Sequence, residues 1–379
     1  MSHIKDGVSF QNLHPCLFLE RSARVYTEKP AVIYGTKIYT YKDLQHRVDL
    51  LARAFLRKGV TPGDRIAYML PNIPELLEGH YGPMRIGAVL VAINTRLSAR
   101  EVSYILRHSG ARAIVFDSEY SKLVEEAIGT DSNIHTKIEV TDVFASIKSD
   151  ALEYETFLET GKDVDLPPID RSELDTVAID YTSGTTGFPK GVQLTHRNLL
   201  MNAYYVGKRM RTTNLDRICI PVPFYHCFGC VLGTLLCVTH GASMIIPAEV
   251  FTATATLGAI QDEQCTAIYG VPTMFIAQLE HPEFQDYDLS SLRTGIMAGS
   301  PCPIEVMQRV VQDMGAHEIT IAYGLTEASP VITQTRTTDP LEIRVGTVGE
   351  PMAGLEVKTV IPGTHVSDSR QATKSVRQR

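Results

Sequence analysis

Apolar residues in the first third of the chain follow helical spacing in some segments and form short unbroken runs in others. The spacing over residues 41–56 predicts a helix, which Gly59 is placed to end. A second helix is expected over 74–84, and Ser98 with Glu101 is a capping-box pattern that predicts the start of a third. The runs that predict strands between these helices are residues 65–70, 88–94 and 113–116. This alternation predicts a parallel, doubly wound sheet with both faces covered.

The same alternation returns after a polar, proline-containing passage at residues 162–175, which we interpret as a linker between two lobes. Thr195 is placed to cap a helix that runs to about Met210. The strands expected in this second part are residues 176–181, 265–269, 292–298 and 318–323. A chain of 379 residues is too long for one core, so two or three lobes are expected.

One apolar segment, residues 228–246, is about long enough to span a bilayer. Polar residues interrupt it, among them Thr239, His240 and Ser243, and no basic residue flanks it closely. We therefore interpret it as a buried helix that runs into a strand, and we expect no transmembrane segment. The N-terminus has neither the apolar run of a signal peptide nor the pattern of a transit peptide.

Composition and charge narrow the possible partners. The formal net charge of −7 gives no general attraction to nucleic acid or to an anionic membrane. Any bound anion must therefore be held locally, by backbone amides and a few cations. Seven cysteines, an odd number that lie mostly within apolar runs, indicate reduced thiols and a cytoplasmic location.

The first candidate for chemistry is the loop that follows the strand ending at Tyr181. It reads YTSGTTGFPKGVQLTH and combines glycines, hydroxyl side chains and one lysine, Lys190. Glycines let backbone N–H groups turn inward around an anion, and the hydroxyls and the lysine would add donors and charge. The residues concerned are Thr182, Ser183, Gly184, Thr185, Thr186, Gly187 and Lys190. Pro189 rules out a Walker A loop, and the alternative interpretation is a flexible surface loop.

A second candidate, AYGLTEASP, lies at the end of another predicted strand, where open α/β sheets bind ligands. Tyr323 could stack on a purine, Thr326 could donate to a phosphate, and Glu327 could bind Mg²⁺ through oxygen. Alone, each could equally be a packed tyrosine, a turn threonine or a solvated glutamate. Their grouping beside Gly324 favours a binding site.

Two further turns complete the set of candidates. The segment MAGSPCP contains Gly299, Ser300 and Pro301 and could bring backbone close to a flat base. The segment PFYHCFGC contains His226, which could line a substrate passage or be a satisfied core histidine. Cys227 and Cys230 have the spacing of a zinc or redox pair, but their surroundings are apolar and no second pair has metal-site spacing.

Together these segments resemble the adenylate-forming superfamily of acyl-CoA synthetases, firefly luciferases and peptide-synthetase adenylation domains. The resemblance runs from about Thr40 to Val360 and is closest to medium- or long-chain fatty acyl-CoA synthetases. It rests on YTSGTTGFPKGV, YGLTE and GTVGEPMAGLEVK in the family's order, with support from GDRIAYMLPN and GAVLVAINTRLS.

The resemblance implies a role for each candidate residue. Residues 182–190 would enclose the β- and γ-phosphates of ATP, and Gly299, Ser300 and Pro301 would pack against adenine opposite Tyr323. Thr326 would contact the α-phosphate, Glu327 would hold Mg²⁺, and His226 would border the acyl pocket together with Phe228 and Gly229. The implied reaction joins a carboxylic acid, such as a fatty acid, to coenzyme A through an acyl-adenylate, with release of pyrophosphate and AMP.

The resemblance also implies a domain organisation. Residues 1–363 would be the large N-terminal domain, with α/β lobes at 1–170 and 171–345 and the start of a small β-barrel subdomain at 346–363. Family members continue into a C-terminal domain with a lysine that contacts the reacting oxygens, whereas this chain ends in THVSDSRQATKSVRQR. We expect residues 364–379 to be disordered and the strand edges before them to be unpaired.

This organisation leaves three functional hypotheses open. The first is an acid–thiol ligase whose activity is reduced or lost in a truncated chain. The second is a non-catalytic fragment that binds a nucleotide or an acyl ligand. The third is an adenylation domain that loads a carrier protein. The sequence does not predict an oligomeric state.

Overall fold

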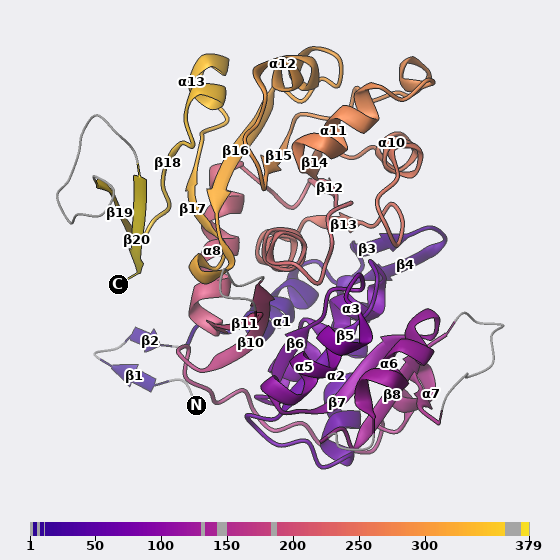
Figure 1. Ribbon diagram of the computed structural model, residues 1–379. Coiled ribbons are helices and arrows are strands. Elements are labelled where there is room, and N and C mark those ends of the chain that lie inside the picture. Colours follow the sequence, from indigo (N-terminus) through magenta and orange to yellow (C-terminus); the bar gives the residue numbers. More distant parts are fainter. Residues whose placement is uncertain are drawn as a thin grey trace.

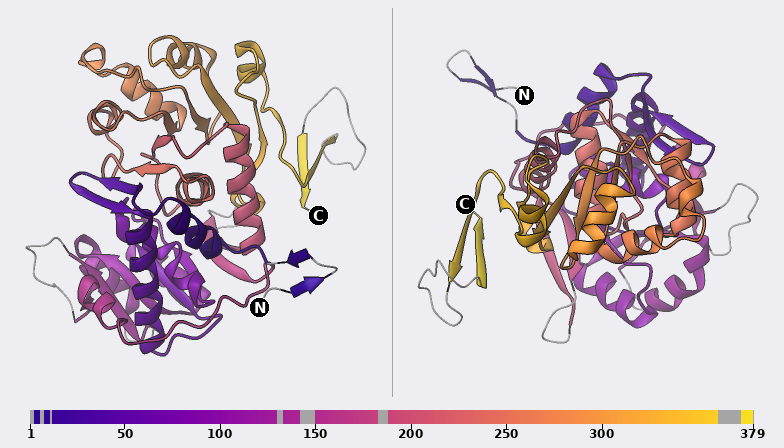
Figure 2. Two further views of the ribbon diagram at one scale, coloured as in Figure 1. Left: turned by 180° about the vertical axis from the view of Figure 1, so that it is seen from behind. Right: turned by 90° about the horizontal axis from the view of Figure 1, so that it is seen from above.

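The computed structural model describes residues 3–5, 8–10, 12–129, 133–141, 150–182, 188–360 and 373–378. Two large sheets organise these residues, one in the lower and one in the upper half of Figure 1. The predicted α/β fold is confirmed. A short hairpin of β1 (His3–Lys5) and β2 (Val8–Phe10) stands apart near the N-terminus (Figure 2).

The first sheet has seven strands, and only its β10–β11 pair is antiparallel. Residues of the central strand, residues 65–69, alternate between two hydrophobic cores on opposite faces of the sheet. Ile66 and Tyr68 pack into the core between the two sheets, and Ala67 and Met69 pack into the core on the other face. The order is β11 (Lys190–Thr195), β10 (Thr176–Thr182), β6 (Val89–Ala92), β5 (Arg65–Met69), β7 (Ala111–Asp117), β8 (Thr136–Val140) and β9 (Leu152–Glu153). Its helices are α2 (Tyr41–Arg57), α3 (Pro74–Gly79), α4 (Gly82–Arg85), α5 (Ala99–Ser109), α6 (Ser121–Ile128) and α7 (Tyr154–Glu159).

The second sheet has nine strands and is parallel at its centre. The order is β18 (Glu350–Pro351), β17 (Val331–Gln334), β16 (Glu318–Gly324), β15 (Thr294–Ala298), β14 (Ala267–Gly270), β12 (Arg217–Cys219), β13 (Ser243–Ile245), β3 (Pro30–Tyr34) and β4 (Lys37–Thr40). Its outer core includes side chains of α10 (Ala253–Asp262), α11 (Pro272–Leu279) and α12 (Ile304–Gln312). The core between the two sheets includes α1 (Pro15–Val25), α8 (His196–Arg209) and α9 (Leu236–His240), and it joins both lobes.

The two lobes exchange strands across the boundary that we expect at residues 170 and 171. The hairpin of β3 and β4, early in the chain, pairs with β13 at the edge of the second sheet. The hairpin of β10 and β11, from beyond the linker, returns to the first sheet beside β6. Which strands pair depends on which strand edges meet in the folded chain, not on their order in the sequence. The linker at residues 162–175 forms no helix or strand. A division by sequence order could not anticipate this exchange.

Several predicted elements are confirmed, with differences at their ends. Helix α2 begins at Tyr41, and Ser98 caps α5 through bonds of 2.8 and 2.6 Å from its N–H and hydroxyl to Glu101. Thr195 caps α8 by accepting from the Asn198 N–H at 3.2 Å. The helix expected over 74–84 is divided into α3 and α4. Strand β11 was not predicted; it pairs antiparallel with β10.

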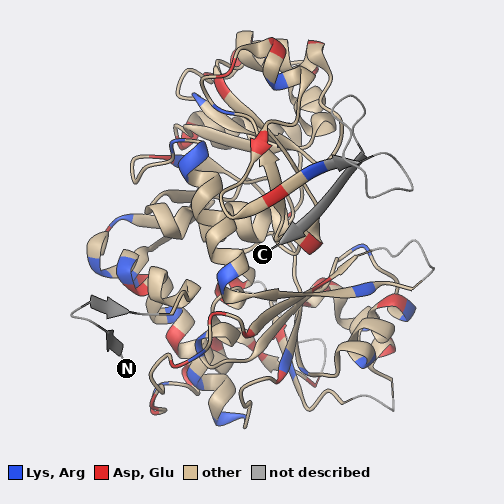
Figure 3. Cartoon of the chain, turned by 90° about the vertical axis from the view of Figure 1, so that its left-hand side faces the viewer, with Lys and Arg blue, Asp and Glu red and all other residues tan. Residues whose placement is uncertain are grey.

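The segment 228–246 forms a buried π-helix (Phe228–Leu235) that continues into α9 and then β13, as predicted. Within the described residues, no helix is both long and apolar enough to cross a bilayer. All seven cysteines are free thiols. Lys and Arg positions are interspersed with Asp and Glu on the side shown in Figure 3.

The C-terminal part differs from expectation. After α13 (Leu341–Gly346), β18 joins the second sheet, and β19 (Leu355–Val360) pairs antiparallel with β20 (Thr373–Gln378). Residues 373–378 are therefore a strand, where a disordered tail was predicted, because the open edge of β19 offers unpaired backbone groups. The remaining tail residues, 364–372 and 379, lie outside the described residues. The described residues form no closed barrel.

Candidate active site

Two neighbouring cavities lie at the carboxyl ends of β15 and β16, the edge where α/β sheets bind ligands. The smaller cavity has a volume of about 290 Å³ and the larger about 670 Å³. Both are lined by Gly299, Ala322, Tyr323 and Gly324, so one strip of backbone separates them. A ligand with two parts could therefore occupy both cavities at once.

Gly324 brings the residues after β16 back against the strand. A Cβ at this position would lie 2.0 Å from the Pro330 carbonyl oxygen, so only glycine permits this approach of two backbones. The ladder between β16 and β17 shifts register at the same point. The Leu325 N–H donates to the Pro330 carbonyl at 3.0 Å, and a single helical turn over 326–328 follows. This tight return places Thr326 and Glu327 on the wall of the smaller cavity.

Thr326, Cys227 and His226 meet on that wall. The Cys227 sulfur lies 3.8 Å from the Thr326 hydroxyl and 3.7 Å from Nδ1 of His226. Burial raises the pKa of the Cys227 thiol to about 12, so it is neutral and a poor nucleophile at neutral pH. This chemistry gives no support to a catalytic cysteine.

Part of His226 is exposed to solvent. The protein that surrounds its imidazole ring nevertheless lowers the pKa of His226 by desolvation. Its Nδ1 accepts a hydrogen bond from the Phe228 N–H at 3.1 Å. The neutral ring consequently carries its proton on Nε2. His226 can thus donate one neutral hydrogen bond, but it supplies no positive charge at neutral pH.

Glu327 is exposed at the same cavity, and its carboxylate makes no hydrogen bond or ion pair with any residue that the structure describes. No group of three or more His, Cys, Asp or Glu residues suited to a metal ion occurs in the described ranges. Mg²⁺ is usually held by one or two carboxylates together with waters and substrate phosphates. A single available carboxylate therefore fits a magnesium ion that arrives with a nucleotide.

The larger cavity lies between two loops. Gly299, Ser300 and Pro301 form one side, and residues 345–349 form the other. Gly299 has a φ of +89°, a backbone conformation that favours glycine. The sequence interpretation gave residues 345–349 no ligand role, although two glycines in Gly-Thr-Val-Gly could have signalled a close approach of backbone.

The Ser/Thr/Gly loop is only partly described. Thr182 ends β10, lines the smaller cavity and pairs with Lys190 across the hairpin. Ser183, Gly184, Thr185, Thr186 and Gly187 lie outside the described residues. Lys190 is exposed and is not among the described residues that line either cavity.

The structure therefore brings most of the predicted residues together. Around the smaller cavity lie Thr182, His226, Gly299, Tyr323, Gly324, Thr326 and Glu327. Ser300 and Pro301 lie on the larger one.

Asp180 is a residue that the sequence interpretation missed. It lies between β6 and β11 in the first sheet, on the same face of β10 as Thr182. Burial raises the pKa of Asp180 to about 7, and its charge raises the pKa of Cys227 and Cys230. A carboxylate within an otherwise apolar strand, TVAIDY, was the available signal.

The chain is similar to known enzymes in sequence and in structure. The profile described as "AMP-binding enzyme" matches residues 19–367. "Putative acyl-CoA synthetase YngI" of Bacillus subtilis (strain 168) is 44% identical over 370 residues, which cover 91% of this chain and 67% of that protein. "Medium-chain acyl-CoA ligase ACSF2, mitochondrial" of Danio rerio is 33% identical, over 91% of this chain and 61% of that protein. The chain thus spans about two thirds or less of the length of these curated relatives.

A solved structure resembles most of this chain. The crystal structure of the anthranilate CoA ligase AuaEII, in complex with anthranoyl-AMP, superposes with a TM-score of 0.86 at 25% sequence identity. The match covers 93% of this chain and 67% of that one.

Proposed function

This chain belongs to the AMP-binding enzyme family, and on that premise we propose that it carries the acid-activating site of an acyl-CoA synthetase. The reaction would convert a carboxylic acid and ATP into an acyl-adenylate and pyrophosphate. The thiol of coenzyme A would then displace AMP. The observation that carries the proposal is the pair of cavities that share Gly299, Tyr323 and Gly324, with Thr326 and Glu327 on the wall of the smaller one.

The two cavities suit the two ends of an acyl-adenylate. We assign the larger cavity, between Gly299 and residues 345–349, to adenine and ribose, and the smaller one to the α-phosphate and the acyl group. The smaller cavity combines the apolar side chains of Phe228, Leu232 and Val331 with the polar groups of Thr326 and Glu327. An acyl chain and a phosphate would both find suitable partners there.

Formation of the acyl-adenylate would require stabilisation of negative charge and would not require a general base. A carboxylic acid with a pKa near 4 is already ionised at neutral pH, so no residue has to remove its proton. The difficulty is that one anion must approach another. Thr326 and the neutral His226 would donate to the developing charge, and Glu327 would hold the Mg²⁺ whose charge offsets that of the phosphates. We further propose that the loop 182–190, with Lys190, encloses the outer phosphates.

We propose a fatty acid as the substrate and the cytoplasm as the location. The apolar lining of the smaller cavity supports an aliphatic chain, and one relative is named a medium-chain acyl-CoA ligase. Seven free thiols support a reducing compartment.

Calorimetric titration with ATP tests the nucleotide site. Glu327→Gln should weaken binding of ATP in the presence of Mg²⁺ by about tenfold or more, because charge-assisted metal contacts are lost. Binding of ATP in EDTA should change little. The matched control is Glu342→Gln, an exposed glutamate on α13, which should leave both affinities unchanged. Equal affinity of the Glu327→Gln and wild-type proteins for Mg-ATP would contradict the assignment of Glu327.

A second measurement tests the reaction class. Exchange of radiolabelled pyrophosphate into ATP, dependent on an added medium-chain fatty acid, would support acyl-adenylate formation. ATP binding without exchange would instead favour a non-catalytic nucleotide-binding role for this chain.

A further inference from the structure

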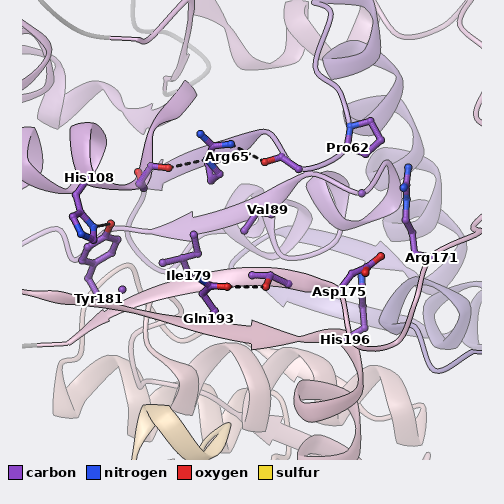
Figure 4. A pocket seen from close by; sticks show the side chains of 15 residues that line it. Pro62, Arg65, Val89, His108, Arg171, Asp175, Ile179, Tyr181, Gln193 and His196 are labelled. Carbon is purple, nitrogen blue, oxygen red and sulfur yellow. Dashed lines mark hydrogen bonds between the residues drawn. The ribbon is translucent and has the colours of Figure 1, made fainter.

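A third cavity, of about 600 Å³, is lined by both strands of the β10–β11 hairpin (Figure 4), and it lies on the other face of that hairpin from the candidate active site. Thr182 on β10 lines the smaller cavity of the active site, whereas Ile179 and Tyr181 on the same strand line this one. Because successive side chains of a strand point to opposite faces, the two sites are separated by the sheet itself. We call this third cavity the hairpin cleft.

Two arginines approach the hairpin cleft, and neither is paired with a carboxylate of the described residues. Arg65 is held by three backbone carbonyls, with bonds of 2.7 Å to Ser109, 2.8 Å to Gly63 and 2.9 Å to Gly110. The guanidinium of Arg171 makes no hydrogen bond or ion pair within the part of the chain that the structure describes. Arg171 stands at one end of the cleft in Figure 4, with Asp175 and His196 below it.

His196 is the second, independent indication of a ligand. His196 lines the cleft and is only 1% exposed, and its buried Nδ1 has no hydrogen-bond partner among the described residues. The ring of His14 lies beside it, with centroids 4.0 Å apart. A buried polar nitrogen without a partner is costly, and a bound polar group that reaches this nitrogen would relieve that cost.

The rest of the cleft suggests the shape of the ligand. Val89 and Ile179 give it an apolar floor (Figure 4), and Gly87 and Gly191 leave the backbone uncovered beside them. Only one carboxylate, that of Asp175, lies among the lining residues, and it accepts a bond from the Ser172 N–H at 3.2 Å. With Arg65 and Arg171 against Asp175, the lining is net positive although the whole chain is net negative.

We propose that the hairpin cleft binds a small organic oxyanion, a carboxylate or a phosphate monoester. Its charged group lies against Arg171 and His196, and its apolar part lies on Val89 and Ile179. A guanidinium without a partner is well suited to either oxyanion, since it can donate two parallel hydrogen bonds. The cleft is distinct from the nucleotide and acyl cavities, so the proposal does not depend on the function proposed above.

The test uses phenyl phosphate and benzoate, which share an apolar ring and differ in the oxyanion. Calorimetric titration of the wild-type chain should detect binding of at least one of them. Arg171→Ala should weaken that binding about tenfold or more, because a charge-assisted hydrogen bond is lost. Asp175→Asn should strengthen it, because a repelling charge next to the anion is removed while the bond from Ser172 can be kept.

A matched control separates this effect from a general loss of positive charge. Arg21→Ala removes an exposed arginine from α1, outside the cleft, and should leave the affinity unchanged. Tighter binding of phenyl phosphate would favour a phosphate monoester as the class of ligand, and tighter binding of benzoate would favour a carboxylate. Absence of binding to the wild type, or equal affinities of the wild-type and Arg171→Ala proteins, would overturn the proposal. Weaker binding by Asp175→Asn would overturn it as well.

Discussion

Replacing Gly324 with alanine should damage the candidate active site far more than its size suggests. The added Cβ would lie 2.0 Å from the Pro330 carbonyl oxygen, 2.8 Å from the Pro330 carbonyl carbon and 2.9 Å from the Val331 Cα. All three are backbone atoms, so no side chain can turn aside. Because Cβ contacts under 3.0 Å essentially do not occur, the two backbones must separate by about 1 Å.

That displacement would act directly on the residues between positions 324 and 330, which include Thr326 and Glu327. A misplacement of about 1 Å can cost roughly a hundredfold in rate, and losing a hydrogen bond to a charged phosphate costs about 1.5–3 kcal/mol in binding. We therefore expect about tenfold weaker binding of Mg-ATP and about a hundredfold slower acid-dependent pyrophosphate exchange. Overpacking should also lower the free energy of unfolding by about 1–3 kcal/mol.

Calorimetry with Mg-ATP, the exchange assay and urea unfolding measure these three quantities. The matched control is Gly346→Ala, because Gly346 lines the larger cavity but has nothing within 4 Å of its added Cβ. It should change each quantity little. The reasoning would be refuted if Gly324→Ala bound Mg-ATP as tightly as the wild type, or if Gly346→Ala were equally impaired.

Two further predictions concern stability. Asp180 ionises near its ordinary value of 3.8 in the unfolded chain but near 7 in the folded one, so stability should fall as pH rises from about 4 to 7. Asp180→Asn should remove that fall and raise the free energy of urea unfolding at pH 8 by about 2–4 kcal/mol, with little effect at pH 4; parallel pH profiles would contradict this. Arg47 contacts the buried Glu78 at 2.5 Å, so Arg47→Met should cost about 3–5 kcal/mol in urea unfolding. Arg24→Met, which breaks an exposed 3.7 Å pair with Glu20, should cost under about 1 kcal/mol, and similar losses for the two variants would count against a special role for burial.

Local signals in the sequence predicted local structure well. Ser98 with Glu101, and Thr195 before α8, are caps whose hydrogen bonds involve neighbours along the chain, so their patterns determine them. Tyr323 and Thr326 could be placed at the edge of the sheet where the two cavities lie, because the carboxyl end of a parallel strand fixes their position. Those inferences needed no knowledge of distant contacts.

Features that depend on distant pairing could not be inferred in the same way. The exchange of hairpins between the two sheets depends on which strand edges meet in space, and no local pattern records that choice. Asp180 owes its raised pKa to burial, and the hairpin cleft depends on Arg65, Arg171 and His196 converging from three separate segments. Such features arise from tertiary packing alone.

The exchanged hairpins also bear on how the chain folds during synthesis. Strand β3 ends at Tyr34 but pairs with β13, so more than 200 further residues must be made before its partner exists. The first sheet likewise waits for β10 and β11, which follow the linker. Contacts of such long sequence separation are slow to form, because the first sheet is complete only once residue 195 has been made and β3 meets its partner only after residue 245. Nascent chains of intermediate length would therefore expose the unpaired edge of β3 until residues 243–245 have been added.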